Sequence, residues 1–168
     1  MHAANFQIRD ETEQDAAALS QLSAQAFGPG RFGRTAYRIR EGVAPVSSLT
    51  LTAWLNDRLV GGIRFTAVSI GGEGGALLLG PLVVDPVHNG KGYGKALVAE
   101  GLARARAQGF RLVVLVGDMP YYGRFGFVPV PPNQIRLPGP VDPARLLALE
   151  LVAGALGNAA GLVQAKAA

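Results

Sequence analysis

The amino-acid sequence predicts a mixed α/β fold with a mostly antiparallel sheet and one parallel pair of strands. Two apolar runs, residues 76–84 and 112–116, are separated by an amphipathic segment over 92–108. A strand, a helix and a strand over this distance form a right-handed crossover, which makes the two strands parallel. Earlier apolar runs follow one another through short turns and predict antiparallel hairpins. With 168 residues, 49% of them hydrophobic, the chain is expected to be a single domain, residues 1–168.

The composition narrows the functional classes. There is no cysteine, which excludes disulfides, thiolate metal sites and a cysteine nucleophile. This fits a reducing compartment, so we expect a cytoplasmic protein. The net charge of +4 is compatible with an anionic ligand, but no basic run is interleaved with aromatic residues, so we expect no nucleic-acid partner. The polar, acidic N-terminus is unlike a signal peptide. The sequence also lacks an uncharged run of ~18 apolar residues, so we expect no membrane helix.

The N-terminal region predicts a strand followed by a helix. Residues 6–9 alternate apolar and polar side chains, as in a half-buried strand. Thr12 and Asp15 have the spacing of a capping box, which marks a helix start. The helix that follows ends near Gly28 and carries apolar residues at helical spacing: Ala16, Leu19, Leu22, Ala26 and Phe27.

The next region predicts a short helix and a pair of strands. The basic residues 31–41 are expected to form a second, shorter helix, and residues 59–70 are expected to form a strand that pairs back on the one before it. Gly61 and Gly62 within that strand indicate a bulge or a close backbone approach. The glycine-rich stretch 71–75 is the expected hairpin tip. The preceding strand, 48–55, places four apolar residues on one face: Leu49, Leu51, Ala53 and Leu55.

The central strand, 76–84, is nearly all apolar, so both of its faces should be buried. Proline donates no ladder hydrogen bond, and we interpret Gly80-Pro81 as a bulge that re-aims residues 82–84. The helix over 92–108 has an apolar stripe formed by Leu97, Val98, Gly101, Leu102 and Ala105.

The C-terminal third is less regular. Residues 118–125 predict a short helix or turn, and residues 127–130 start a strand that two prolines interrupt. Residues 145–152 are compatible with a strand or a helix. The tail from Gly154 is rich in alanine and glycine and is expected to pack weakly.

A glycine-rich turn between the central strand and the helix is the main candidate site. Its residues are Asn89, Gly90, Lys91, Gly92, Tyr93, Gly94 and Lys95. Glycines at alternate positions let backbone N–H groups point at one ligand, and the following helix directs its positive dipole end there. The turn lacks the spacing of a P-loop and of a dinucleotide fingerprint. A tight connection that needs positive φ is the alternative interpretation.

Two motifs together resemble the GCN5-related N-acetyltransferase (GNAT) superfamily. Val84-Asp85-Pro86 followed by residues 89–97 is similar to its acetyl-CoA-binding segment, Gln/Arg-x-x-Gly-x-Gly/Ala, with Asn89 in place of Gln or Arg. Residues 122–127 are similar to the second signature, an aromatic turn before Gly-Phe. The extended form, residues 117–127, resembles the YhbS-like subgroup of bacterial acetyltransferases.

The resemblance implies an acyl-CoA N-acyltransferase fold in which the two parallel strands splay apart. Backbone groups of Leu82, Val83 and Val84 would pair with the pantetheine arm of acetyl-CoA, the cosubstrate, and the pyrophosphate would sit on Asn89 to Lys95. A primary amine of a small molecule or peptide would attack the thioester directly. The Val84 N–H would polarise the carbonyl, and Tyr122 would protonate the thiolate, with Tyr121 as the rival hydroxyl.

The general base stays open at this point: Asp118, Glu41, Glu73 and water are candidates, and Asp118 is also a helix-cap residue. We expect the side chains of His88, Lys91 and Lys95 to be exposed to solvent, and His2 lies at the N-terminus. No His and carboxylate spacing predicts a metal site. The arginines of 31–41 fit either an anionic acceptor or an exposed helix. A non-catalytic acyl-CoA-binding module and a nucleotide-binding protein are the alternative functions, and family members often form homodimers.

Overall fold

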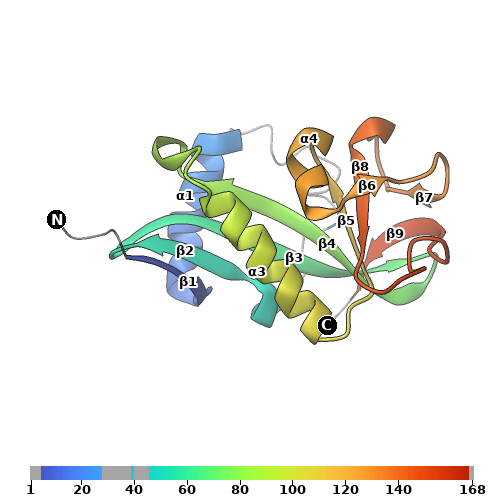
Figure 1. Cartoon of the computed structure of the whole chain (residues 1–168), viewed down its shortest axis with the longest axis horizontal. Coiled ribbons are helices and arrows are strands. Elements are labelled where there is room, and N and C mark those ends of the chain that lie inside the picture. The colour runs from blue at the N-terminus through green and yellow to red at the C-terminus, as the bar shows by residue number, and fades with distance from the viewer. Residues whose placement is uncertain (1–4, 28–38, 40–45, 167–168) are drawn as a thin grey trace.

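The computed structural model describes residues 5–27, 39 and 46–166, and Figure 1 shows how its elements are arranged. Its described strands form a nine-stranded sheet with the path β1-β2-β3-β4-β5-β8-β6, beside which β9 pairs with β3 and β7 pairs with β9. The strands are β1 (Phe6–Asp10), β2 (Leu51–Leu55), β3 (Arg58–Ile70), β4 (Glu73–Val84), β5 (Leu112–Val116), β6 (Val128–Pro129), β7 (Ile135–Arg136), β8 (Leu146–Glu150) and β9 (Gly161–Ala165). The described helices include α1 (Ala16–Phe27), α3 (Tyr93–Ala107) and α4 (Met119–Tyr122), with 3-10 turns η1 (Glu13–Asp15), η3 (Ser47–Leu49), η4 (Pro86–His88), η5 (Gly123–Phe125) and η6 (Pro143–Arg145).

The predicted sheet is confirmed. β4 and β5 pair in parallel around α3, and the other described neighbours pair antiparallel except for the short β7–β9 pair, which is also parallel. The capping box is present, with the Thr12 N–H donating to Asp15 Oδ2 at 2.8 Å, and it caps η1, which leads into α1. The helix expected over 31–41 lies outside the described residues except for Ile39, which is buried.

The glycine pair of β3 allows close approaches on both sides of the strand. A Cβ atom on Gly61 would lie 2.7 Å from the Val83 carbonyl oxygen of β4 and 3.4 Å from Leu97 of α3, and a Cβ atom on Gly62 would lie 2.5 Å from Leu19 of α1. Neighbouring residues of a strand face opposite sides of the sheet, so α3 and α1 cover opposite faces. A register shift between β2 and β3 also falls here, so the expected bulge and the close approach are both present.

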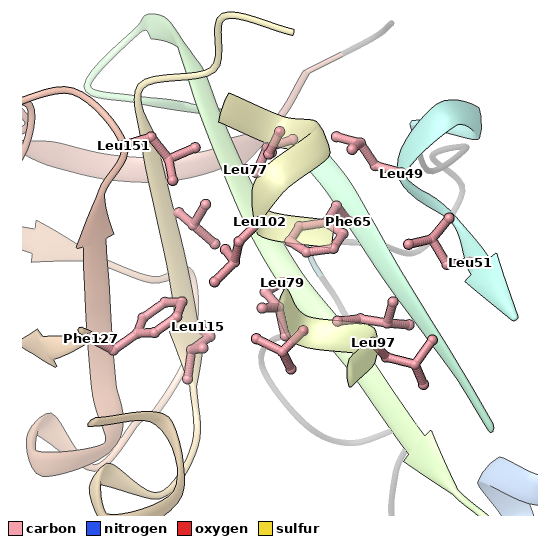
Figure 2. Packing of buried hydrophobic residues seen from close by; sticks show 14 of the residues in the cluster. Leu49, Leu51, Phe65, Leu77, Leu79, Leu97, Leu102, Leu115, Phe127 and Leu151 are labelled. Carbon is pink, nitrogen blue, oxygen red and sulfur yellow. The ribbon is translucent and has the colours of Figure 1, made fainter. Parts of the chain in front are cut away.

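Two buried clusters sandwich the central strands. Leu77 and Leu79 of β4 belong to the cluster beneath α3, whereas Leu78 between them belongs to the cluster on the other face. The prediction that this strand is buried on both faces is therefore confirmed. Figure 2 shows the α3-side cluster, in which Leu97 and Leu102 of α3 lie over the sheet beside Phe65 of β3.

Two boundaries below differ from the expectation, and one open assignment is resolved. The strand expected over 48–55 begins only at Leu51, because residues 47–49 form η3, although Leu49 still packs in the α3-side cluster. The hairpin tip is only Gly71-Gly72, since Ile70 pairs with Glu73 and the β4 ladder begins there. Residues 145–152, left between strand and helix, contain strand β8.

The expectation of a weakly packed tail from Gly154 is wrong. The tail contains β9, which pairs with β3 at Val68 to Ile70, and Val163 is fully buried. Its alanines and glycines lack the branched side chains that mark a strand in the sequence. The strand forms because β3 is long enough to offer a second edge beyond its pairing with β2.

Candidate active site

A gap between β4 and β5 is the first part of the site. The two strands pair only from Ala76–Leu112 to Leu78–Val114, yet β4 continues to Val84 and β5 to Val116. Beyond this point β4 stays bonded to β3 through Leu82 to Val84, and β5 stays bonded to β8 through Val116. Each strand therefore follows its outer neighbour, and the sheet opens between them, as Figure 1 shows on the side of α4.

The bulge predicted at Gly80-Pro81 lies beside this opening. The β3–β4 register shifts between Ile63–Leu82 and Phe65–Leu79, so two β4 residues stand opposite one β3 residue. Gly80 has φ of 133°, which a residue with a side chain rarely adopts. The bulge is confirmed, and it separates the paired half of β4 from the half that borders the gap.

Backbone groups of two predicted cofactor-binding residues face the gap. The Asp85 N–H donates to the Val60 carbonyl of β3 at 2.8 Å. Peptide groups alternate in direction along a strand, so Val83 also turns toward β3, and Leu82 and Val84 turn the opposite way. Leu82 and Val84 therefore present their N–H and C=O groups to the gap, whereas Val83, 3% exposed, holds the strand in the sheet.

The glycine turn uses its three glycines in two ways. Gly90 and Gly92 have φ of 79° and 84°, so these positions need the left-handed conformation. Gly94 is instead buried inside the first turn of α3, where other side chains occupy the place of a Cβ atom. The positive φ of the alternative interpretation is thus present at two of the three glycines, and the third position needs glycine because a Cβ atom has no room there.

The start of α3 is open to a ligand. Gly92 is its N-cap and provides no side-chain cap, and the Ala96 N–H makes the first helical bond to the Gly92 carbonyl at 3.0 Å. The N–H groups of Tyr93, Gly94 and Lys95 therefore precede the helical ladder and lack partners within it. Asn89, Lys91 and Lys95 are exposed around this end. The arrangement suits an anion.

A buried carboxylate that the sequence analysis missed holds the turn. Asp85 is 6% exposed, accepts a bond from the Val87 N–H at 3.1 Å and pairs with Arg58 at 3.3 Å. It is the N-cap of η4 and is followed by Pro86. Asp before Pro at a helix start is a recognisable capping pattern, so the sequence did contain the signal.

The two tyrosines of α4 occupy different environments. Tyr122 packs into the α3-side cluster: its ring lies 5.8 Å from Phe127, and a Cβ atom on Gly117 would lie 2.5 Å from its Cε2. Burial, followed by Tyr121 and Asp118, raises the pKa of Tyr122 well above its ordinary range, and Arg145 acts against this rise. Its phenol therefore stays protonated at neutral pH.

Tyr121 points toward the glycine turn instead. A Cβ atom on Gly94 would lie 2.8 Å from Tyr121 Oη. Burial raises the pKa of Tyr121, and Arg124, whose guanidinium carbon lies 4.8 Å from the ring centroid, acts in the opposite direction. The structure thus brings Tyr121, Leu82, Val84 and Gly94 to one place.

The candidate general bases differ in their position and in their solvent exposure. Asp118 lies two residues after β5 as the N-cap residue of α4, is 74% exposed and pairs with Arg145 at 3.5 Å, and it makes no side-chain cap bond to α4. Glu73 lies at the opposite end of β4 from Val84. Glu41 lies outside the described residues, as do His2 and the arginines of 31–41.

His88 departs from the expected solvated loop histidine. Its ring lies 6.1 Å from Tyr93, and both ring nitrogens are buried without a hydrogen-bond partner. Within the described ranges, no group of three or more His, Asp or Glu side chains could hold a metal ion. No helix in the same ranges is long and apolar enough to cross a membrane.

Known proteins are similar to this chain in sequence and in architecture. The model of the Acetyltransferase (GNAT) family matches residues 16–127. The uncharacterized N-acetyltransferase YjhQ of Escherichia coli K12 is 31% identical over 132 residues, which cover 77% of this chain and 72% of YjhQ. The uncharacterized N-acetyltransferase YhbS of the same strain is 29% identical over 161 residues, or 94% of each chain.

Two solved structures agree with these matches. YhbS from Escherichia coli, in complex with CoA, has a TM-score of 0.84 and 27% identity, and the match covers 99% of this chain and 92% of that one. A GNAT family acetyltransferase from Brucella melitensis, in complex with acetyl-CoA, has a TM-score of 0.62 and 33% identity, covering 86% and 96%. The chain therefore belongs to the GNAT family of acetyltransferases, in which it is YhbS-like.

Proposed function

We propose that this chain, acting as one domain over residues 1–168, transfers an acetyl group from acetyl-CoA to a primary amine of a small molecule or peptide. The observation that carries the proposal is the gap between β4 and β5, which opens next to the uncapped start of α3. An extended arm with amide groups fits the first feature and a pyrophosphate fits the second. CoA is the ligand of the YhbS complex, and acetyl-CoA that of the Brucella protein, which supports this ligand.

The cofactor would bind mainly through the backbone. Its pantetheine amides pair with the gap-facing N–H and C=O groups of Leu82 and Val84, like an added strand. Its pyrophosphate accepts bonds from the open N–H groups at the start of α3 and in the turn from Asn89. Lys91 and Lys95 add long-range attraction from exposed positions.

The reaction is a direct displacement at the thioester. The amine nitrogen forms a bond to the acetyl carbon, and the Val84 N–H stabilises the charge that develops on the carbonyl oxygen. The carbon–sulfur bond then breaks, and the thiolate takes a proton from Tyr122. The protons of the acceptor nitrogen pass to water, directly or through Asp118, and one returns to the tyrosinate. The products are the N-acetyl amine and CoA.

The protonation state of Tyr122 fits an acid. Burial raises its pKa, so the phenol carries a proton throughout the neutral range. The same burial opposes release of that proton, whereas the positive charge of Arg145 lowers the pKa of Tyr122 and so favours release. Arg145 is half-exposed and paired with Asp118, so its charge stays beside the tyrosine.

The experiment has a binding arm and a turnover arm. In the binding arm, a thermal-shift series with CoA, ATP and NAD should favour CoA; stronger stabilisation by ATP or NAD would support a nucleotide-binding protein. In the turnover arm, amines, peptides and aminoglycosides are screened for thiol release from acetyl-CoA. At least one acceptor class should give release above hydrolysis.

The variant Tyr122→Phe separates an enzyme from a sensor. We expect about 10²–10⁴-fold lower kcat with unchanged CoA affinity, the range typical of a lost general acid. CoA binding without turnover on any acceptor class would instead identify a non-catalytic acyl-CoA-binding module. Full turnover in the variant would refute the assignment of Tyr122.

A further inference from the structure

The hydroxyl of Tyr121 lies where the start of α3, the end of β4 and α4 meet. The position of a Cβ atom on Gly94 is 2.8 Å from Tyr121 Oη, 3.3 Å from Val84 Cγ2 and 3.9 Å from Leu82 Cδ2. One small volume is thus bordered by the first turn of α3, by the side chains of Leu82 and Val84 on the α3 face of β4, and by α4. The phenol brings a polar group next to these two apolar side chains.

The ring of Tyr121 is held in place by its own helix and the turn after it. The Arg124 guanidinium carbon lies 4.8 Å from the ring centroid, a cation–π contact. The Tyr122 ring meets it edge-on at 4.9 Å, and the Phe125 ring at 5.9 Å. A ring fixed by aromatic contacts presents its hydroxyl at one position with little loss of conformational entropy.

The two adjacent tyrosines therefore differ in what their hydroxyls can reach. Tyr122 is packed against Gly117 and Phe127 in the α3-side cluster. Tyr121 crosses toward α3, and Gly94 leaves the space that its hydroxyl fills. Partial burial raises the pKa of Tyr121, so this hydroxyl is a neutral donor at physiological pH.

We propose that Tyr121 is a cofactor-binding residue whose hydroxyl donates a hydrogen bond to the phosphopantetheine part of acyl-CoA. The inference rests on the proposed function, because it takes the pyrophosphate to lie at the start of α3 and the arm to lie along Leu82 and Val84. The hydroxyl stands between these two positions, where the phosphate joins the arm. Tyr121 thereby acts in binding, and Tyr122 keeps the role of acid.

The test compares two variants that each remove one phenolic hydroxyl. Calorimetric titration of Tyr121→Phe with CoA should give about tenfold weaker binding, the range for a lost bond to a charged acceptor. Titration with adenosine 3′,5′-bisphosphate, which lacks the phosphopantetheine arm, should be unchanged. In turnover, the variant should raise KM for acetyl-CoA and leave kcat within about twofold of wild type. Tyr122→Phe should show the reverse, with CoA affinity unchanged and kcat reduced.

Each failure has a different meaning. If wild-type protein does not bind CoA, the proposed function fails. If wild type binds CoA and Tyr121→Phe binds it equally well, the inference fails while the proposed function stands. Equal losses for CoA and the bisphosphate would also overturn it, because they would indicate general damage. Arg124→Met, which removes the cation–π contact and keeps the hydroxyl, should weaken CoA binding about threefold with the same ligand pattern.

Discussion

Gly101 of α3 gives a prediction in which helix propensity and packing have opposite signs. The residue is buried and faces β3, and a Cβ atom there would lie 2.4 Å from Phe65 Cε2 and 2.7 Å from Cζ. Phe65 is fully buried and pairs with Leu79 beside the β4 bulge, so its ring has little room to turn away. Figure 2 shows this ring beside α3 within the cluster.

The expected magnitude follows from two terms. Alanine in place of glycine inside a helix stabilises by about 1 kcal/mol through propensity. Overpacking of a well-filled core destabilises by about 1–3 kcal/mol. Gly101→Ala should therefore lower the free energy of unfolding by about 1 kcal/mol, or the melting temperature by about 2–4 °C.

Urea unfolding of wild type, Gly101→Ala and Ala103→Gly measures this difference in the free energy of unfolding directly. Ala103→Gly is the matched control, since Ala103 lies on the exposed side of the same helix and its loss reports propensity alone. We expect both variants to be destabilised. If Gly101→Ala stabilises by as much as Ala103→Gly destabilises, the contact with Phe65 has no energetic weight and the packing argument is refuted.

Three further predictions concern charge and space near the site. Because burial raises the pKa of Tyr122 in the folded protein, the stabilisation from its protonated phenol is complete below the unfolded pKa of about 10 and is lost as the pH rises above it. In denaturant titrations above pH 10, the free energy of unfolding of wild type should therefore fall by about 1 kcal/mol more per pH unit than that of Tyr122→Phe. Equal pH dependence of the two proteins would contradict this. Arg64→Met leaves the nearly buried Glu11 carboxylate without its two guanidinium bonds and should destabilise by about 2 kcal/mol in denaturant titration. Arg58→Met removes one bond, at 3.3 Å, from Asp85, a carboxylate as buried as Glu11 that keeps its bond from the Val87 N–H, and should destabilise by less than about 1 kcal/mol; equal losses would argue against the number of lost bonds as the cause. Gly94→Ala places a Cβ atom against the Tyr121 hydroxyl and should weaken CoA binding about tenfold in calorimetry, and wild-type affinity would show that the space is not needed.

Local sequence patterns are sufficient to predict most of the fold. The α3 helix, its flanking strands and the capping box each depend on periodicity or spacing within about 20 residues, so the sequence is sufficient to predict them. The strand character of residues 146–150 was ambiguous because its run of leucine and alanine suits either structure. Pairing with β5 decides it, since a strand there satisfies the backbone groups of both.

The candidate site likewise has parts that the sequence predicts and parts that depend on tertiary contacts. The glycine turn and the Tyr122 motif could be found because each is a contiguous segment with a recognisable pattern. Asp118 was assigned a cap role from its position, but its carboxylate pairs with Arg145, which follows it by more than two dozen residues. Such a pair depends on where β8 lies beside β5, and no local spacing encodes that.

The sequence by itself determined the elements from β1 through the α3 crossover to β5, the glycine-rich turn and the family, because these depend on neighbouring residues and on motifs at a set separation. Only the tertiary structure decided that β4 and β5 part after Leu78, since each strand is held by a partner from elsewhere in the chain. It also decided that Tyr121, and not Tyr122, turns its hydroxyl to Gly94. The direction of a side chain on a short helix depends on what packs around it, and here those contacts come from α3, β4 and the turn after α4.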